Sequence, residues 1–161
     1  MLIYQKASLF TAPLGSILVH ACNAQGVWGS GIAVEFKKRF PGSFTAYNQY
    51  CTDALTAGRT ITGTALVTGP EQGYYIGCLI TSFNYGVRRD AEPVILTNTE
   101  VAVRNLLRSL KNPPAGVVNP IISIYSNKFN SGFFGVRWEE TEEILKDLTG
   151  PTVWTVMDPN L

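Results

Sequence analysis

Apolar and polar residues follow one another along this chain in blocks that predict strands and helices in turn. Short apolar blocks between turn-forming residues predict β-strands over residues 1–5, 16–21, 62–67, 74–81, 121–125 and 151–157. Apolar residues spaced three and four apart predict helices over residues 31–40, 43–54, 98–110 and 138–148, with Asn98 or Thr99 as the N-cap of the third. Pro41-Gly42 and Pro113-Pro114 are helix-ending pairs, and residues 69–73 predict a turn. Strands that alternate with helices predict a three-layer α/β domain around a largely parallel sheet.

Two glycine-bearing loops follow directly on predicted strands. The first, residues 20–31, opens with His20, Cys22 and Asn23, carries three glycines and leads into a predicted helix. The second covers residues 126–136. Backbone N–H groups near glycines, together with a helix N-terminus, bind phosphate groups. Because ligands bind beyond the carboxyl ends of parallel strands, we expect the two loops to meet there and form one cleft for a phosphate-bearing ligand.

Size and charge narrow the classes of partner. The chain has 161 residues, of which 45% are hydrophobic, so we expect one domain spanning residues 1–161. A net charge of +1 provides no electrostatic basis for binding nucleic acid or an anionic membrane. The three cysteines have no metal-ligand spacing, so neither a metal nor a cofactor is expected from the sequence.

The location of the protein is also an expectation. Residues 14–22 faintly resemble a signal peptide that ends in a lipoprotein-type Ala-Cys, but Pro13 interrupts the run and Lys6 is the only basic residue before it. No apolar run approaches the ~18 residues of a membrane span. An odd number of cysteines fits a reducing compartment. We therefore expect a soluble protein of the cytoplasm, and also of the nucleus.

The residues of the two loops carry a family resemblance. His20-Ala-Cys-Asn23 followed by Gly26-Val-Trp-Gly-Ser-Gly-Ile-Ala33 resembles the first ligand loop of the macrodomain family, which binds ADP-ribose. Phe129-Asn-Ser-Gly-Phe-Phe-Gly-Val-Arg-Trp138 resembles the second phosphate loop of that family. The order of elements extends the resemblance over essentially the whole chain, and the branch it resembles most is the fungal ADP-ribose 1″-phosphate phosphatases. The fold that this implies is a three-layer α/β/α macrodomain with a mixed, largely parallel central sheet.

The resemblance also implies a set of substrate-binding residues. The segment after the first strand would contact adenine, the first loop would line the pyrophosphate and the distal ribose, and the second loop would clamp the phosphates. These three groups are Ala7, Ser8 and Leu9; then Cys22, Ala24, Trp28, Gly29, Ser30, Gly31 and Ile32; then Asn130, Ser131, Gly132, Phe133, Phe134, Gly135 and Val136. Asn23 matches the asparagine that contacts the distal ribose.

Three departures from the family pattern bear on activity. Ser8 stands where many members have an aspartate that reads the adenine amino group, so adenine selectivity is weaker by this reasoning. Ala33 stands where deacetylase and mono-ADP-ribosyl hydrolase members have an aspartate. The branch that removes ADP-ribose from protein acids uses a second-loop aspartate, and Phe133-Phe134-Gly135 lacks it. However, Phe36-Lys-Lys-Arg-Phe40 resembles the lysine-rich helix of that branch.

Several residues allow a catalytic and a structural interpretation. His20 can move a proton at neutral pH, given an ordinary pKa near ~6.5, or it can be a structural residue at the end of a strand. We assign catalysis to His20 and Asn23. One of Phe133 and Phe134 is expected to stack on a ribose, and Trp28 is a second candidate for such stacking. Residues 88–90 form a solvated turn or help to hold a terminal phosphate, and Cys78 is expected to be a buried, inert thiol.

The leading hypothesis is therefore a phosphoric monoester hydrolase. It would remove the 1″-phosphate of ADP-ribose 1″-phosphate, a by-product of tRNA splicing, without a metal or cofactor. Its partner would be this small-molecule substrate, with no direct contact to nucleic acid or membrane. Two alternatives remain: a module that only binds ADP-ribose or ADP-ribosylated proteins, and a hydrolase that removes ADP-ribose from modified proteins.

Overall fold

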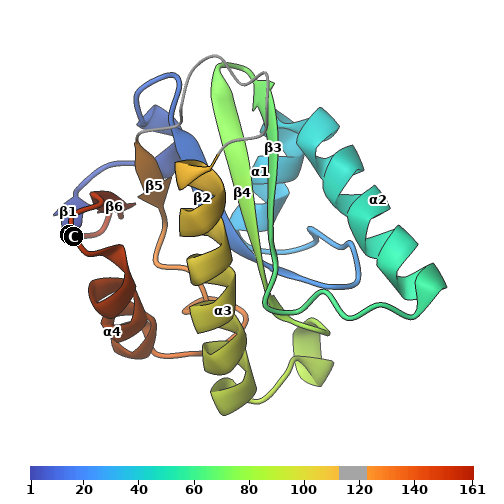
Figure 1. The fold of residues 1–161 in the computed structure, drawn as a ribbon. Helices are drawn as coiled ribbons and strands as arrows, with labels where there is room; N and C mark the ends of the chain where they lie inside the picture. Colours follow the sequence, from blue (N-terminus) through green and yellow to red (C-terminus); the bar gives the residue numbers. More distant parts are fainter. Residues whose placement is uncertain (113–122) are drawn as a thin grey trace.

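Six strands form one sheet with helices on both faces in the computed structural model, which describes residues 1–112 and 123–161 (Figure 1). The strands are β1 (Leu2–Gln5), β2 (Ile17–Asn23), β3 (Ala65–Glu71), β4 (Tyr74–Ser82), β5 (Ile124–Ser126) and β6 (Trp154–Met157). The helices are α1 (Ile32–Arg39), α2 (Pro41–Ala57), α3 (Glu92–Lys111) and α4 (Trp138–Thr149), with short 3₁₀ turns η1 (Leu9–Thr11) and η2 (Gly86–Arg88).

The sheet is mixed and largely parallel. Its strand order is β1-β6-β5-β2-β4-β3, and only β3 runs antiparallel, paired with β4. Helices α1 and α2 cover one face of the sheet, while α3 and α4 cover the other (Figure 1). These observations confirm the expected three-layer α/β/α architecture.

Strand β2 lies between β5 and β4 and divides the core in two. Its side chains alternate between the faces of the sheet, as the period of a strand requires. Leu18 and Cys22 belong to the apolar cluster under α1 and α2, whereas Ile17 and Val19 belong to the cluster under α3 and α4. The even-numbered residues of β2 up to Cys22 therefore face α1 and α2, and the odd-numbered residues up to Ala21 face α3 and α4.

Two boundaries on either side of the first loop differ from the sequence prediction. Strand β2 continues two residues beyond Ala21, because Cys22 and Asn23 still pair with Ile80 and Ser82 of β4. The first loop therefore begins after Asn23, not at His20. Helix α1 starts at Ile32, one residue after its predicted start, because Gly31 is its N-cap.

Helix α3 and strand β3 are longer than predicted. Helix α3 begins at Glu92, with Ala91 as its N-cap and a proline in its first turn, because Pro93 is well tolerated there. Asn98 and Thr99 are interior residues of that helix, so their predicted N-cap role is wrong. Strand β3 begins at Ala65, three residues after its predicted start, and runs on to Glu71, so it overlaps the predicted turn over residues 69–73. Among the described residues, no helix combines the length and apolar composition needed to cross a bilayer.

Part of the predicted fifth strand falls on residues 121–122, outside the described residues, as does the helix-ending pair Pro113-Pro114. The described part of that strand is β5, which ends one residue later than predicted. The remaining predicted helices and strands agree with the structure to within a few residues at their ends.

Candidate functional site

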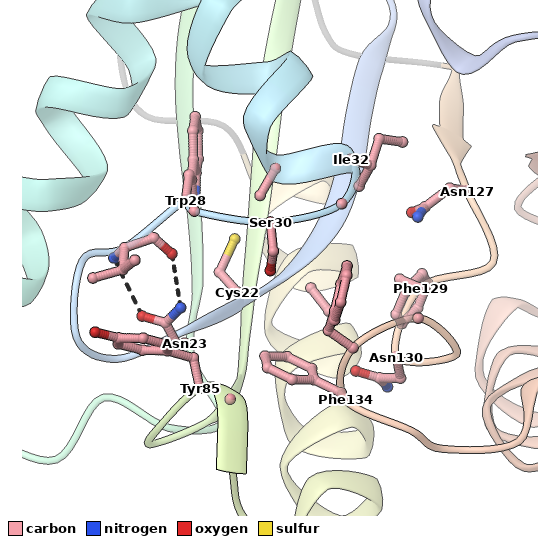
Figure 2. A pocket seen from close by; sticks show the side chains of 18 of the residues that line it. Cys22, Asn23, Trp28, Ser30, Ile32, Tyr85, Asn127, Phe129, Asn130 and Phe134 are labelled. Carbon is pink, nitrogen blue, oxygen red and sulfur yellow. Dashed lines mark hydrogen bonds between the residues drawn. The ribbon is translucent and has the colours of Figure 1, made fainter. Parts of the chain in front are cut away.

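A cleft opens at the carboxyl ends of β2 and β5, between the first and second loops (Figure 2). It encloses about 300 Å³, a volume at the lower end of the range for small-molecule sites. Its lining residues come from the end of β2, the first loop, the start of α1, the η2 turn and the second loop. They are Ala21, Cys22, Asn23, Val27, Trp28, Gly29, Ser30, Gly31, Ile32, Ala33, Tyr85, Gly86, Asn127, Lys128, Phe129, Asn130, Gly132, Phe133 and Phe134.

A second pocket of about 370 Å³ adjoins the first. The two pockets share four lining residues, so together they form one elongated cleft: the shared residues are Ile32, Asn127, Lys128 and Gly132. The far end of the second pocket is lined by the η1 turn and the end of β6, through Ser8, Leu9, Phe10, Met157, Asp158 and Pro159.

The side chain of Asn23 shapes the first loop. Its Nδ2 donates to the Val27 carbonyl at 2.7 Å, and its Oδ1 accepts from the backbone N–H groups of Gln25 and Val27 (Figure 2). The buried Tyr47 hydroxyl donates to the Asn23 carbonyl at 2.6 Å. Because the amide oxygen is fully engaged by the loop, Asn23 acts first as the residue that positions the loop, and it contributes to the cleft wall.

Gly31 joins the first loop to α1 and brings the two loops into contact. It adopts φ 60°, and a Cβ there would lie 3.2 Å from the Phe133 ring. No side chain among the described residues caps the first turn of α1. The N–H groups of Ile32 and Ala33 thus begin a helix at the cleft, where the positive end of the helix dipole attracts an anion.

Asn130 anchors the second loop in the core. It has a positive φ of 67° and is 3% exposed. Its Oδ1 accepts from the Thr81 hydroxyl at 2.9 Å, and its Nδ2 donates to the hydroxyls of Thr99 and Thr141. Its carbonyl accepts from Val136. This network ties the loop to β4, α3 and α4, so the side chain of Asn130 is structural although the residue lines the cleft.

The backbone of the second loop offers hydrogen-bond donors to a ligand. The Gly135 N–H closes a turn onto the Gly132 carbonyl at 3.0 Å. Within residues 1–112 and 123–161, the N–H groups of Gly132, Phe133 and Phe134 have no protein acceptor. All three residues line the first pocket together with Ile32 and Ala33 at the start of α1, so the backbones of both loops border the same space.

Two polar residues just after β5 were missed by the sequence analysis. Lys128 is the only basic residue among the described residues that line either pocket, and it forms an ion pair with Asp158 at 3.1 Å. The backbone N–H of Asn160, and then Lys128, hold the pKa of the Asp158 carboxyl below its usual value. The Oδ1 of Asn127 is buried and has no hydrogen-bond partner among the described residues. Their position directly after a buried strand was the available signal.

The structure places His20 in the core and not in the cleft, so its assignment as the proton-transfer residue is corrected. It is fully buried on β2, and its ring stacks on Phe36 with 3.9 Å between centroids. Burial lowers the pKa of His20 to about 3, so it is neutral at physiological pH. The physical reason is the alternation of side chains along a strand: His20 lies on the same face of the sheet as Leu18 and Cys22, which is the face that α1 and α2 cover.

Several other predicted binding residues do not line either pocket. Ala24 and Val136 are buried, and Ala7 and Gly135 are absent from both linings. Trp28 lines the cleft with its edge but is 2% exposed and stacks on Tyr47, so it is a core residue and not a free stacking platform. The other predicted binding residues do line the cleft: Ser8, Leu9, Cys22, Gly29, Ser30, Gly31, Ile32, Asn130, Ser131, Gly132, Phe133 and Phe134.

The two phenylalanines of the second loop both line the cleft but differ in exposure. Phe133 is 67% exposed, and its ring lies beside Gly31. Phe134 is half-buried in the cleft wall (Figure 2). Arg89, one of the three residues considered for a phosphate contact, donates to the Gly86 carbonyl and lies beside Gly135 without lining a pocket. That placement favours the interpretation of residues 88–90 as a solvated turn.

A largely parallel sheet whose carboxyl edge carries two loops around an elongated cleft defines an α/β domain with a candidate ligand site at that edge. The family model of the Macro domain matches residues 19–145. The chain therefore belongs to the Macro domain family, as the two loop motifs indicated.

Curated relatives and solved structures agree with this assignment. The ADP-ribose 1''-phosphate phosphatase of Neosartorya fischeri is 33% identical over an alignment that is 174 positions long and covers 88% of this chain and 87% of that protein. The protein of the same name from Chaetomium globosum is 35% identical over 151 residues, covering 88% of this chain and 80% of that protein. The macrodomain of Mycobacterium tuberculosis DarG superposes with a TM-score of 0.76 at 27% identity, over 99% of this chain and 97% of that one.

The buried His20 predicts a specific dependence of stability on acid. Its pKa is lower in the folded protein than in the unfolded chain, so between about pH 6.5 and pH 3 the unfolded state binds the extra proton. The stability is full above the unfolded pKa and falls with decreasing pH, by about 3 kcal/mol at pH 4.5. We expect urea unfolding in a chelating buffer to show this loss in the wild type, and His20→Phe to lack it. Parallel pH profiles for the two proteins would contradict the placement of His20.

Proposed function

We propose that this protein is a phosphatase that converts ADP-ribose 1″-phosphate into ADP-ribose and inorganic phosphate. The observation that carries the proposal is the pair of loops whose backbones line one cleft, with N–H groups in the second loop that have no acceptor among the described residues, in a chain about one-third identical to fungal proteins bearing that name. We further propose that the substrate arises in tRNA splicing and that the protein acts in the cytoplasm or nucleus.

The diphosphate of the ligand would lie where the two pockets join. That junction has the start of α1 on one side and Gly132 of the second loop on the other, with Lys128 beside it. Helix N-termini, free backbone N–H groups and one cation are the groups that hold a diphosphate. This arrangement would concentrate positive charge at the junction of the pockets, although the whole chain has a net charge of only +1.

The two ends of the ligand would then fill different pockets. The adenosine end fits the second pocket, where Ser8 and Leu9 line the wall, while the distal ribose and its 1″-phosphate fit the first. Ser8 is a weak reader of adenine because its hydroxyl oxygen already accepts from the Phe10 N–H in the η1 turn. Asp158 lines that same pocket and is the carboxylate available to an amino group there.

Catalysis would rest on positioning and on electrostatic stabilisation. His20 is unavailable for proton transfer because it is buried and does not line the cleft. The backbone N–H groups of the two loops would instead stabilise the charge on the phosphoryl oxygens while water attacks. Asn23 and Ser30 line the first pocket near the end that would hold the 1″-phosphate.

Phosphate release from ADP-ribose 1″-phosphate tests the proposal directly. We expect turnover by the wild type, unchanged after dialysis against a chelator, and retained by a folded His20→Phe variant. Tight binding of ADP-ribose without release of phosphate would replace the proposal with a binding module. Release of ADP-ribose from a modified acidic side chain, with no phosphatase activity, would replace it with a protein ADP-ribosyl hydrolase.

Lys128 is the only basic residue among the described residues that line the cleft, so its removal should lower the affinity for the substrate. Lys128→Met removes a charge-assisted contact and leaves Asp158 unpaired beside an anionic ligand, so we expect KM to rise about 10- to 100-fold. Lys128→Met combined with Asp158→Asn should recover part of that loss. The matched control is Arg137→Met, whose side chain is 72% exposed and lines neither pocket. An unchanged KM in Lys128→Met would place the diphosphate elsewhere.

Gly132 allows bulk and charge to be tested separately. A Cβ at this position would meet no atom within 4 Å, so substitutions there should fold normally. We expect Gly132→Ala to bind ADP-ribose like the wild type, Gly132→Gln to bind more weakly, and Gly132→Glu to lose binding, as measured by calorimetry. Equal affinity in folded Gly132→Glu would show that the second loop does not hold the phosphates. Gly31 is a poorer probe because its positive φ and the Phe133 ring penalise any side chain.

A further inference from the structure

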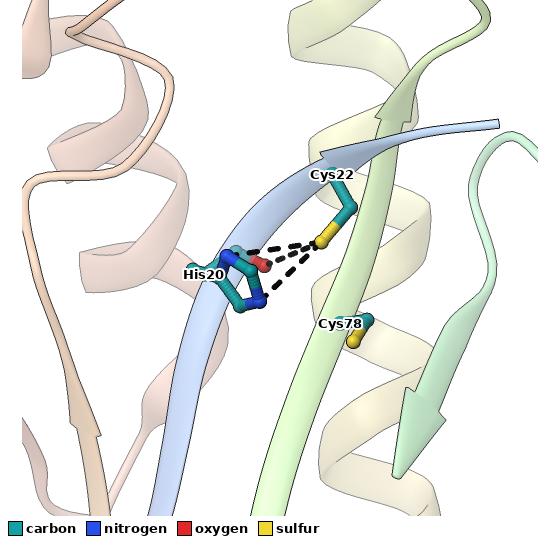
Figure 3. A group of neighbouring side chains, drawn as sticks. All are labelled: His20, Cys22 and Cys78. Carbon is teal, nitrogen blue, oxygen red and sulfur yellow. Dashed lines mark hydrogen bonds between the residues drawn. The ribbon is translucent and has the colours of Figure 1, made fainter. Parts of the chain in front are cut away.

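One group of potential metal ligands lies beneath the cleft. His20 and Cys22 of β2 and Cys78 of β4 share one face of the sheet, because His20 pairs with Cys78 in the strand register (Figure 3). Their donor atoms all lie within 4.8 Å of one another, and all three residues are buried. The Cys22 Sγ is 3.6 Å from Nε2 and 3.8 Å from Nδ1 of His20.

We propose that His20, Cys22 and Cys78 bind one thiophilic d¹⁰ metal ion, copper(I), through an imidazole nitrogen and two thiolates between β2 and β4. The site is separate from the phosphatase chemistry proposed above, and its ion takes no part in that reaction. The sequence could not indicate it, because the third ligand comes from a neighbouring strand 56 positions further along the chain.

The chemistry and number of the donors favour copper(I). Metal bonds of about 2.0–2.3 Å to nitrogen and sulfur place the donors of one ion roughly 3.5–4 Å apart, and the Cys22–His20 separations are of that size. Because the Cys22 sulfur lies almost equally far from both ring nitrogens, its side chain must turn toward the lone pair of one nitrogen when an ion binds. Thiolates select soft ions, and zinc in buried structural sites is almost always held by four ligands. Among the described residues, no carboxylate and no fourth cysteine or histidine joins this group.

The surroundings of the cluster supply a second, independent observation. The Nε1 of Trp28 is buried and has no hydrogen-bond partner among the described residues. Burial raises the pKa of the Cys22 thiol well above its ordinary value, and the nearby Trp28 N–H acts in the opposite direction. A thiolate on Cys22 would give this N–H an anionic acceptor. The Trp28 and His20 rings meet edge-on, with 4.8 Å between their centroids. The Phe36 ring stacks on the His20 ring with an interplanar angle of 2°. The imidazole plane is therefore fixed before an ion binds.

An ion could reach the cluster from the cleft. Cys22 lines the first pocket, whereas His20 and Cys78 do not. The bound ion would bridge the central strand β2 to β4 directly before Asn23, whose amide shapes the first loop. Metal binding should accordingly stabilise the fold.

Anaerobic titration with copper(I), in competition with a chromophoric copper(I) chelator, tests the proposal on the intact chain. We expect one ion per wild-type chain, a near-ultraviolet thiolate-to-copper absorption band, and a higher Tm. Cys22→Ala, Cys78→Ala and His20→Phe should each weaken copper binding by at least about 100-fold, since losing an outer-shell partner of a metal ligand alone costs about 10- to 100-fold.

The matched control is Cys51→Ala. Cys51 is equally buried in the same apolar cluster but is not one of the three grouped ligands, so its variant should keep wild-type copper affinity. If a ligand variant fails to fold by circular dichroism, the wild-type stoichiometry and absorption band still decide the proposal. Absence of the band in the wild type, or equal affinity in folded Cys51→Ala and Cys78→Ala, would overturn it. One tightly held zinc ion with no copper bound would overturn the choice of copper(I).

Discussion

The buried amide of Asn130 is the interaction on which the cleft depends. It satisfies three hydroxyl groups from β4, α3 and α4 while its own backbone holds a positive φ that turns the second loop. Hydrogen bonds of this kind each contribute about 1 kcal/mol, but leaving a buried partner unsatisfied costs about 1–3 kcal/mol. The loop is therefore held firmly at its base, while its tip from Gly132 to Phe134 lines the cleft.

Asn23 does the corresponding work on the first loop. Its amide and the Tyr47 hydroxyl fix the turn that leads from β2 toward Gly31, where α1 begins. Both loops are thus positioned by core asparagines, and in the proposed function they would recognise phosphate through their backbones. A site built in this way would need few charged side chains, so a nearly neutral chain could bind a diphosphate. Lys128 supplies the one local positive charge within the described lining.

The sequence predicted the layers of the fold and the location of the cleft well, because both follow from periodicity and from glycine-bearing loops after buried strands. It failed at His20, because a polar residue near a strand end gives no sign of whether the strand has ended. Pairing of Cys22 and Asn23 with β4 extends β2, and the alternation of the strand then turns His20 into the core. Lys128 and Asn127 directly follow a buried strand, but they were missed because that position alone does not separate a cleft-facing polar residue from a solvent-facing one. The group formed by His20, Cys22 and Cys78 depends on strand register, which the sequence alone does not contain.

The central claim is that the backbone N–H groups of both loops hold the phosphates together, and amide hydrogen exchange measured residue by residue tests it most directly. With saturating ADP-ribose, exchange should slow at least about tenfold at Ile32 and Ala33 and also at Gly132, Phe133 and Phe134, since an amide bonded to a ligand exchanges only when the site opens. Amides remote from the cleft, such as those of exposed turns, should change little. Protection confined to one loop, with the ligand bound, would contradict the account.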